Sequence, residues 1–233
     1  MKTLIFGHRG IPTQFPENSL AGFRYAIENG VEGLEFDVQL TRDQVPVIMH
    51  DERLDRTTTG MGRLTDFTYA QLKQFQLENG ELIPTLDDFM ALVGGQDVCL
   101  NLEFKTDKVQ YPGIEALVLD KVMRADLIQE VIFSSFHLAT LQTARLIAPS
   151  QNYCFLADHV MLDPELFIRQ HQLSGLHLNH YQPVGQFAER IWTVNSRYQI
   201  TSMFKRGVTG IFTDDFEKAM QIRDQVQPLL MTS

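Results

Sequence analysis

Two carboxylates on one predicted strand are the first residues whose types and spacing could do chemistry. Glu35 and Asp37 alternate with Leu34 and Phe36, and a strand places successive side chains on opposite faces, so the two acids project from the same face. Paired carboxylates are costly to bury unless a cation neutralises them, and hard divalent cations prefer oxygen ligands. This stretch alone therefore indicates either a divalent metal site or a solvated strand face.

A predicted hairpin brings a histidine back towards the two acids. Residues 41–44 form a polar break, and the apolar run after it is typical of a second strand that returns antiparallel to the first. Pairing outward from this four-residue turn sets Leu40 opposite Val45 and Glu35 level with His50. We therefore expect one imidazole close to the carboxylates.

Further charged residues stand where other predicted strands end. His8 and Arg9 follow the first strand, and Glu103 and Lys105 alternate on the third. A third inward carboxylate would complete an oxygen-rich cage suited to Mg²⁺ or Ca²⁺, and two cations beside a metal suit a phosphate. Two histidines can act as general base and acid, because imidazole titrates near neutral pH. Together these residue types indicate phosphodiester cleavage, whereas Glu103 and Lys105 alone are equally compatible with a buried ion pair.

The elements that must position these side chains alternate between strands and helices. Eight apolar runs are predicted as strands, each followed by a helical segment; the one after the sixth strand is expected around Phe187. The strands are predicted at 3–6, 34–40, 98–105, 131–134, 153–156, 176–178, 191–194 and 210–213. Such alternation implies a parallel sheet, and eight units close into an α/β fold, the (β/α)8 TIM barrel, with its active site at the carboxyl ends of the strands. We interpret residues 1–233 as one catalytic domain with a small insertion, about 51–83, in the second βα loop.

Composition limits the classes of partner. The 233 residues include 29 acidic and 20 basic side chains, a net charge of −9, which argues against nucleic acid and against stable association with anionic membranes. The first apolar run is too short for a signal peptide, and no run approaches a membrane span. Cys99 and Cys154 lie in apolar runs and are expected as reduced thiols. We therefore expect a cytoplasmic protein, with no prediction of its oligomeric state.

The motifs around these residues resemble those of the glycerophosphodiester phosphodiesterases, in the larger group that includes phosphatidylinositol-specific phospholipases C. The resemblance runs in order over nearly the whole chain, and the combination of motifs is highly specific. The matching motifs are Gly-His-Arg-Gly at 7–10, Pro-Glu-Asn-Ser at 16–19, Glu-Phe-Asp-Val-Gln-Leu-Thr-Arg-Asp at 35–43, Val-Ile-Met-His-Asp at 47–51, Leu-Asp-Arg-Thr-Thr at 54–58, Pro-Thr-Leu at 84–86, Asn-Leu-Glu-Phe-Lys at 101–105, Ser-Ser-Phe at 134–136, Trp-Thr-Val-Asn at 192–195 and Ile-Phe-Thr-Asp at 211–214.

This resemblance implies cleavage of small-molecule glycerophosphodiesters to sn-glycerol 3-phosphate and an alcohol, a reaction of lipid and glycerol metabolism. It also implies a bound divalent cation, Mg²⁺ or Ca²⁺. The resemblance implies that Glu35, Asp37 and Glu103 are the metal ligands. It implies that His8 and His50 are the catalytic base and acid, and that Arg9 and Lys105 bind the phosphate.

Several other residues have modest expected roles. Trp192, at a strand end, is expected to form an apolar wall beside the glycerol, with a core aromatic as the alternative. Asn18 or Ser19 is expected to cap a helix, most simply Asn18, and Glu17 is expected to orient Arg9. His177 is expected as a loop or surface residue near the end of the sixth strand, with a minor substrate contact as the alternative.

Alternatives from other classes are open at this point. A phospholipase-like lyase that stops at a cyclic phosphate should show an apolar rim, and no βα loop holds a hydrophobic run long enough for one. A silent binding domain would tolerate loss of a key histidine or acid, and none is lost. An amidohydrolase-type barrel would want a His-x-His pair on the first strand, which is missing. Departures from the family pattern are Ser19, Gln44 and Phe216, and the later loops carry no prediction of the alcohol group.

Overall fold

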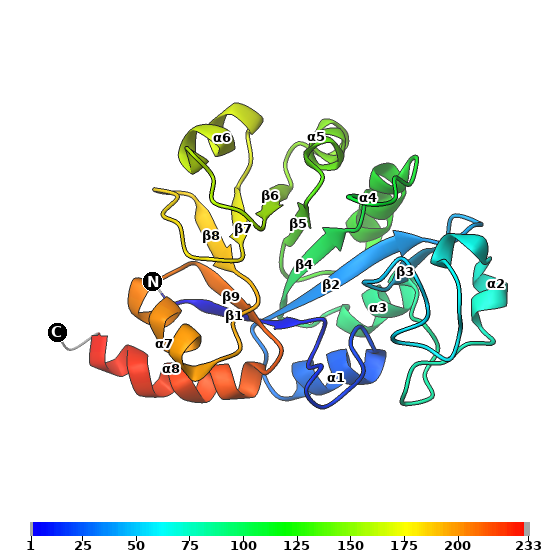
Figure 1. Ribbon diagram of the computed structural model, residues 1–233, viewed down its shortest axis with the longest axis horizontal. Coiled ribbons are helices and arrows are strands. Elements are labelled where there is room, and N and C mark those ends of the chain that lie inside the picture. Colours follow the sequence, from blue (N-terminus) through cyan, green and yellow to red (C-terminus); the bar gives the residue numbers. More distant parts are fainter. Residues whose placement is uncertain (1, 231–233) are drawn as a thin grey trace.

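A closed barrel of eight parallel strands forms the centre of the protein in the computed structural model, which describes residues 2–230 (Figure 1). The barrel strands are β1 (Leu4–His8), β2 (Gly33–Leu40), β4 (Cys99–Phe104), β5 (Val131–Ser135), β6 (Asn152–Ala157), β7 (Gly175–Leu178), β8 (Ala188–Ile191) and β9 (Gly210–Thr213). Strand β1 pairs in parallel with β2 on one side and with β9 on the other, which closes the ring. The predicted (β/α)8 TIM barrel is therefore confirmed.

Helices surround the barrel, with one connection left without a helix. They are α1 (Leu20–Glu28), α3 (Leu86–Val93), α4 (Ile114–Arg124), α5 (Leu138–Ile147), α6 (Pro164–His171), α7 (Arg197–Arg206) and α8 (Phe216–Leu230). The described stretch 179–187, between β7 and β8, contains no helix, so the prediction of one around Phe187 was wrong. Pro183 lacks a backbone donor and Gly185 has a φ of +64°, and both disfavour a helix. Phe187 instead packs under the guanidinium of Arg169, 5.0 Å from its ring centre.

Strand β2 separates the apolar outer layer from the chemistry inside the barrel. All eight of its residues are buried. Phe36 packs outward against Phe23 of α1 and Phe89 of α3, with ring centres 6.4 and 4.1 Å away. Because side chains alternate along a strand, the acids between these apolar residues turn towards the barrel axis. The outer apolar contacts anchor β2 to α1 and α3. The strand can therefore carry two acidic side chains on its inner face.

The hairpin after β2 forms, but its register differs by one residue from the prediction. Strand β3 (Pro46–Ile48) pairs Leu40 with Pro46, not with Val45. The turn is a three-residue loop in which Gln44 has a φ of 63°, a left-handed conformation typical of such hairpins. The predicted alignment of His50 with Glu35 was therefore wrong, because the four-residue turn assumed for it does not form.

Residues 51–83 form a compact extension beside β3, seen at the right of Figure 1. It contains a 3₁₀ turn, η1 (Leu64–Asp66), and a short helix, α2 (Tyr69–Leu72). Seven buried apolar side chains make a separate cluster between the extension and the hairpin: Val47, Met49, Leu54, Leu64, Leu72, Leu77 and Ile83. This cluster packs the extension against the hairpin. That the segment is an insertion in the second βα loop stays a prediction.

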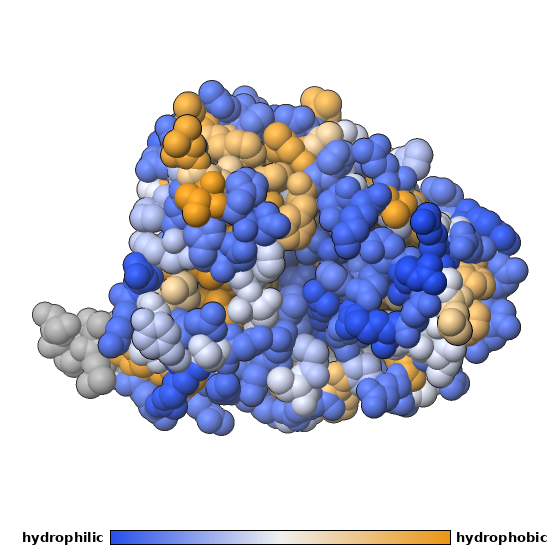
Figure 2. Space-filling view, viewed as in Figure 1, coloured by the Kyte–Doolittle hydropathy of each residue, from blue (hydrophilic) through white to orange (hydrophobic). Residues whose placement is uncertain are grey.

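The surface is mostly hydrophilic and is hollowed near the centre of the view in Figure 2. Apolar atoms gather over α6, and the connection that leads into this helix exposes Val160 and Leu162, whose relative exposures are 73% and 103%. Single exposed apolar residues are ordinary on protein surfaces. Between residues 2 and 230, no helix combines the length and the apolar character needed to cross a bilayer.

Candidate active site

Three carboxylates meet inside the barrel at the carboxyl ends of β2 and β4. Glu35, Asp37 and Glu103 each offer an oxygen atom, and these atoms lie within 4.8 Å of one another. The parallel register sets Asp37 beside Glu103, so alternation on two adjacent strands is enough to gather all three. All three side chains are buried. The structure thus brings together the acids that the sequence singled out as metal ligands.

Crowding of these acids changes their pKa values. Burial, followed by the charges of Asp37 and Glu103, raises the pKa of Glu35 well above its usual range. Burial also raises the pKa of Glu103, to about 7, although Lys105 opposes the shift. For Asp37, burial favours the neutral form, but opposing effects led by the charge of Arg9 outweigh it and lower the pKa. Without a further cation, the three acids cannot all be ionised near neutral pH.

Arg9 lies between the acid cluster and the surface. Its backbone amide donates to Glu35 at 2.9 Å, and its guanidinium lies 3.4 Å from Asp37 and 3.0 Å from Glu17. The residue has a φ of 54°, which folds the loop after β1 back over the strand end. Gly7 permits this fold, because a Cβ there would lie 2.4 Å from the Gly10 carbonyl oxygen. The expectation that Glu17 orients Arg9 matches the observed ion pair.

Asn18 serves the acid cluster and does not cap the helix. Its amide Nδ2 donates to Asp37 Oδ2 at 2.9 Å, and a φ of 58° turns its side chain inward. The cap of α1 is Ser19, whose hydroxyl accepts from the Gly22 amide at 3.1 Å. The prediction of Asn18 as the cap was therefore wrong, because the left-handed turn leaves the next residue at the start of the helix.

Lys105 is buried beside the acids. Its Nζ lies 2.8 Å from Glu103 Oε1 and 4.0 Å from Asp37 Oδ1. The ammonium also lies 5.8 Å above the ring of Phe136. Burial opposes the charged form, but the two carboxylates outweigh it and raise the pKa of Lys105. In this geometry the side chain is an ion-pair partner of the acid cluster and remains charged.

His8, at the end of β1, is held by the last strand of the barrel. Its Nδ1 lies 2.6 Å from Asp214 Oδ1, and its Nε2 faces the acid cluster, 4.0 Å from Glu35. Asn195 donates to Asp214 Oδ2 at 2.6 Å and accepts from its backbone amide at 2.9 Å. Burial favours neutral Asp214, but the hydrogen bond from His8 leads the opposing effects, and the pKa is lowered. We refer to His8, Asp214 and Asn195 as the first arm.

His50 follows β3 and is held by its neighbour in the sequence. Its Nδ1 lies 2.7 Å from Asp51 Oδ1. The buried amide of Gln39 lies 2.8, 3.1 and 2.9 Å from the carbonyl oxygens of residues 49, 50 and 51, and Tyr111 donates to Gln39 Oε1 at 2.8 Å. These contacts fix the backbone that carries the imidazole, so His50 reaches the site although the register shifted.

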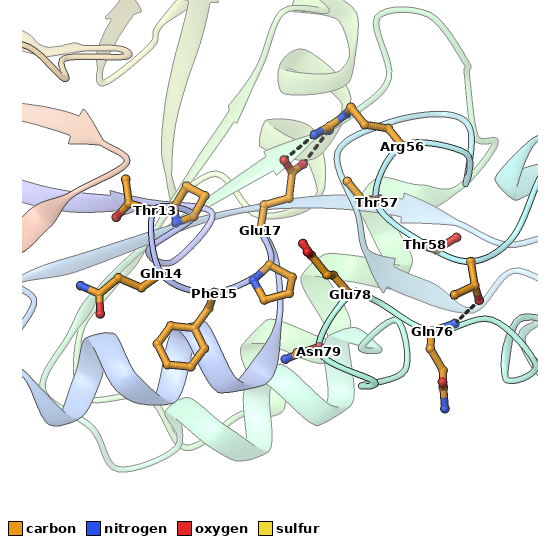
Figure 3. A pocket seen from close by; sticks show the side chains of 13 residues that line it. Thr13, Gln14, Phe15, Glu17, Arg56, Thr57, Thr58, Gln76, Glu78 and Asn79 are labelled. Carbon is orange, nitrogen blue, oxygen red and sulfur yellow. Dashed lines mark hydrogen bonds and ion pairs between the residues drawn. The ribbon is translucent and has the colours of Figure 1, made fainter.

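A chain of ion pairs extends from His50 to Arg9 across the mouth of the barrel. The guanidinium of Arg56 contacts both oxygens of Asp51, at 2.6 and 2.9 Å, and both oxygens of Glu17, at 2.6 and 2.7 Å. Figure 3 shows the two hydrogen bonds between Arg56 and Glu17. Glu17 then contacts Arg9 at 3.0 Å. We refer to His50, Asp51 and Arg56 as the second arm.

The environment of His50, with burial as the largest effect, favours the neutral form of its imidazole. Burial lowers the pKa of the imidazole, and the nearby cations Arg9 and Lys105 lower it further. Asp37 and the hydrogen bond to Asp51 raise the pKa, but by less. At neutral pH, His50 is therefore able to accept a proton at Nε2.

A cavity of about 140 Å³ contains both imidazoles and most of the charged groups. Its lining includes His8, Arg9, Glu35, His50, Asn101, Glu103, Lys105, Phe136, His177 and Trp192. Trp192 stands one residue beyond β8 and packs edge-on against Phe136, with ring centres 5.4 Å apart. His177 is fully buried inside the barrel, so the expectation of a loop or surface position was wrong. A larger groove of about 740 Å³ lies on the other side of Glu17 and Arg56 (Figure 3) and contains none of the three acids.

Some of these residues had no assigned role before the fold was known. Asp214 and Asn195 belong to quoted motifs, but both lie more than 180 positions from His8. Asp214 contacts His8 because β9 pairs with β1, and Asn195 contacts Asp214. Gln39 continues the inward alternation of Glu35 and Asp37, which was the available signal for it.

Comparisons with known proteins agree with this geometry. Residues 8–218 match the sequence profile of the Glycerophosphoryl diester phosphodiesterase family. A glycerophosphodiester phosphodiesterase of Caldanaerobacter subterraneus subsp. tengcongensis is 34% identical, over 95% of this chain and 98% of that protein. A second, from Bacillus altitudinis, is 34% identical over 97% of this chain and all of that protein. An Oleispira antarctica phosphodiesterase, solved in complex with the product sn-glycerol-3-phosphate, superposes with a TM-score of 0.86 at 26% identity, over 96% of this chain and 97% of that one.

Proposed function

The chain belongs to the glycerophosphoryl diester phosphodiesterase family and is an enzyme of that kind, and we propose that it hydrolyses glycerophosphodiesters to sn-glycerol 3-phosphate and an alcohol by paired histidine catalysis. One observation supports this most strongly. Two imidazoles, each bound through Nδ1 by a carboxylate, line the same cavity as a buried cluster of acids. The product complex of the Oleispira protein indicates the same substrate class.

The acid cluster fits a divalent cation. Asp37 Oδ1 is buried and has no hydrogen-bond partner among the described residues. Burial and the neighbouring carboxylates raise the pKa values of Glu35 and Glu103, an effect that a bound cation would oppose. Glu35, Asp37 and Glu103 would hold Mg²⁺ or Ca²⁺, both of which prefer carboxylate oxygens. When bound, the ion would ionise its ligands and stabilise negative charge on the phosphate.

Arg9 and Lys105 would bind the phosphate. Both cations remain charged beside the acids, and both line the cavity. Binding of a metal ion would satisfy Glu103 and so release Lys105 from its present ion pair. The planar guanidinium of Arg9 can donate two hydrogen bonds to phosphate oxygens, and each charge-assisted contact contributes about 1.5–3 kcal/mol.

The two histidines would divide the proton transfers. Each carboxylate accepts from Nδ1–H, which leaves Nε2 as the reactive nitrogen. The proposed roles are the reverse of the order that the resemblance implies. Neutral His50 takes the proton of the glycerol 2-hydroxyl as its oxygen bonds to phosphorus, and protonated His8 gives its proton to the departing alcohol oxygen. The resulting cyclic phosphate is opened by water, which gives a proton to His8 while His50 returns its proton to the 2-oxygen. Ionised Asp214 stabilises the imidazolium of His8 before the first step and after the second.

The reaction is tested directly by its product. Purified protein with Mg²⁺ or Ca²⁺ should release sn-glycerol 3-phosphate from glycerophosphocholine and from glycerophosphoethanolamine. An analogue without the 2-hydroxyl should be a poor substrate. Equal turnover of that analogue would contradict the cyclic route, and no product from either natural diester would contradict the proposed substrate class. The cytoplasmic location stays a prediction of the sequence.

A further inference from the structure

Four buried polar atoms on side chains that line the cavity have no hydrogen-bond partner among the described residues, and one of them, Nε of Arg9, lies beside the acid cluster. The other three belong to uncharged side chains. They are Nδ1 of His177, Nε1 of Trp192 and Oδ1 of Asn101, each on a different strand or strand end of the barrel. His177 is fully buried and Asn101 is 1% exposed. A buried polar group without a partner is unfavourable, so three on uncharged side chains of one cavity indicate a ligand that completes them.

Arg190 sets the tautomer of His177. The two residues are neighbours in the register of β7 and β8, and the guanidinium NH1 lies 3.4 Å from His177 Nε2. A guanidinium can only donate, so Nε2 must be the acceptor and must lack a proton. Burial, followed by the charge of Arg190, also lowers the pKa of His177 well below its usual value. The ring is therefore neutral, and its one proton is on Nδ1.

A hydroxyl group is both a donor and an acceptor, and so matches the hydrogen-bonding needs of these three atoms. The Nδ1–H of His177 and the Nε1–H of Trp192 can donate to a hydroxyl oxygen, and Asn101 Oδ1 can accept from a hydroxyl proton. In the structure Asn101 donates from Nδ2 to Ser134 Oγ at 3.0 Å, which leaves Oδ1 as the amide atom without a partner. A charged group is a poor match, because the donors are neutral and a carboxylate or phosphate would leave Asn101 Oδ1 unsatisfied.

The two glycerol hydroxyls differ in position. In the proposed reaction the 2-hydroxyl lies beside the phosphate and gives its proton to a histidine, which leaves the terminal primary hydroxyl without a partner. We infer that His177 is a specificity-determining residue whose Nδ1–H donates to this terminal hydroxyl, with Arg190 as the positioning residue that keeps the proton on Nδ1. This inference rests on the proposed function, and it assigns the glycerol end of the substrate to the interior of the barrel.

The test compares two substrates in matched variants. One substrate is glycerophosphocholine, and the other is its analogue with the terminal hydroxyl replaced by hydrogen, 2-hydroxypropyl phosphocholine. The wild-type enzyme should favour the first by at least about tenfold in kcat/KM, because the analogue leaves a buried donor unpaired. His177→Phe keeps a ring against Phe212, 5.0 Å away in the wild-type protein, and should reduce this preference to about unity.

Two further variants separate recognition from structure. His177→Asn keeps a donor near the Nδ1 position and should retain most of the preference. His159→Phe changes an exposed histidine, 66% exposed, and should leave the preference at its wild-type value. If His177→Phe lowers both kcat/KM values and leaves their ratio intact, the side chain is structural and the inference is wrong.

A wild-type measurement covers the case in which His177→Phe does not fold. Inhibition by sn-glycerol 3-phosphate should be at least about tenfold stronger than inhibition by 2-hydroxypropyl phosphate, for the same unpaired donor. Equal inhibition, or equal turnover of the two diesters, would overturn the inference and leave the proposed function in place. No turnover of either diester by the wild type would contradict the proposed function itself.

Discussion

The two arms hold their histidines in the same way and compensate their carboxylates differently. The Nδ1 to carboxylate distances are 2.6 Å in the first arm and 2.7 Å in the second. In the first arm, Asp214 is supported by the neutral amide of Asn195. In the second, Asp51 is bound through both oxygens by the charged Arg56, which lowers its pKa strongly.

This difference indicates how one residue type can perform two proton transfers. The first arm contains no cationic side chain apart from His8 itself. The negative charge of Asp214 can therefore stabilise the positive charge that His8 would carry when the alcohol leaves. The charge of Asp51 is largely compensated by Arg56, and burial and cations lower the pKa of His50, which suits a group that must first be neutral. In the proposed mechanism, the carboxylate partners would therefore separate the roles of two identical side chains.

The largest effects should come from the imidazoles themselves. His8→Ala and His50→Ala should each reduce kcat by at least about a hundredfold, because a positioned acid or base contributes ~10²–10⁴-fold. A glycerol diester of 4-nitrophenol has a leaving group that needs no proton, so His8→Ala should lose much less on this substrate, and His50→Ala should lose as much as before. Equal losses on both substrates in both variants would contradict the division of roles.

Substitutions of the supporting acids should distinguish the two arms. Asp214→Asn removes a carboxylate whose only ion-pair partner among the described residues is His8. It should reduce kcat by about 10²-fold or more, since loss of such an acid also permits the wrong tautomer. Asp51→Asn removes a charge that Arg56 largely compensates and should cost about tenfold. Steady-state kinetics of the two variants at pH 7 give the comparison directly. A larger loss in Asp51→Asn than in Asp214→Asn would reverse our interpretation.

A smaller effect should appear in the pH profile of an Arg56 variant. Arg56→Gln exposes His50 to the full charge of Asp51, so the pKa of His50 should rise and the acidic limb of kcat/KM should move to higher pH. The side chain is 50% exposed, so we expect less than about one pH unit and a severalfold loss at neutral pH. The matched control is Arg53→Gln, because Arg53 pairs with Asp55 in the same extension and does not contact Asp51. If the acidic limb of kcat/KM does not move in Arg56→Gln, or moves equally in both variants, Arg56 does not compensate the charge of Asp51.

In ion-free protein, the acid cluster between the arms should also change how the free energy of unfolding depends on pH. In ion-free protein the pKa of Glu103 is raised from 4.5 to about 7, so the native state binds more protons than the unfolded state between these pH values. The free energy of unfolding should therefore fall as the pH rises through this window, by on the order of 1–3 kcal/mol. Chemical denaturation in EDTA at pH 5 and pH 7.5 measures the fall, which Glu103→Gln should reduce. Stability that rises over this range in EDTA would contradict the raised pKa.

The strand pattern predicted the barrel and the acid cluster because both depend on alternation along single strands. The period of two on β2 and β4 is enough to place Glu35, Asp37 and Glu103 on inner faces. Hairpin register was less predictable. It depends on whether the turn has three or four residues, and a left-handed Gln44 decides this without a glycine to indicate it.

The supports of the two arms were the least predictable part of the site. Asp51 adjoins His50, but its role depends on Arg56, which the extension folds back over the barrel. Asp214 is 206 positions from His8, and only closure of the ring between β1 and β9 makes them neighbours. Side chains that orient a catalytic group across strands have no spacing of their own in the sequence, so their roles follow only from the fold.

The central claim is that the two arms act on a phosphate held by a metal ion at the acid cluster. The most direct test is the rate of sn-glycerol 3-phosphate release from glycerophosphocholine by wild-type enzyme, measured before EDTA, in excess EDTA, and after Mg²⁺ or Ca²⁺ is restored. We predict that the rate falls to background in EDTA and returns with one of the two ions. An undiminished rate in excess EDTA would contradict the claim.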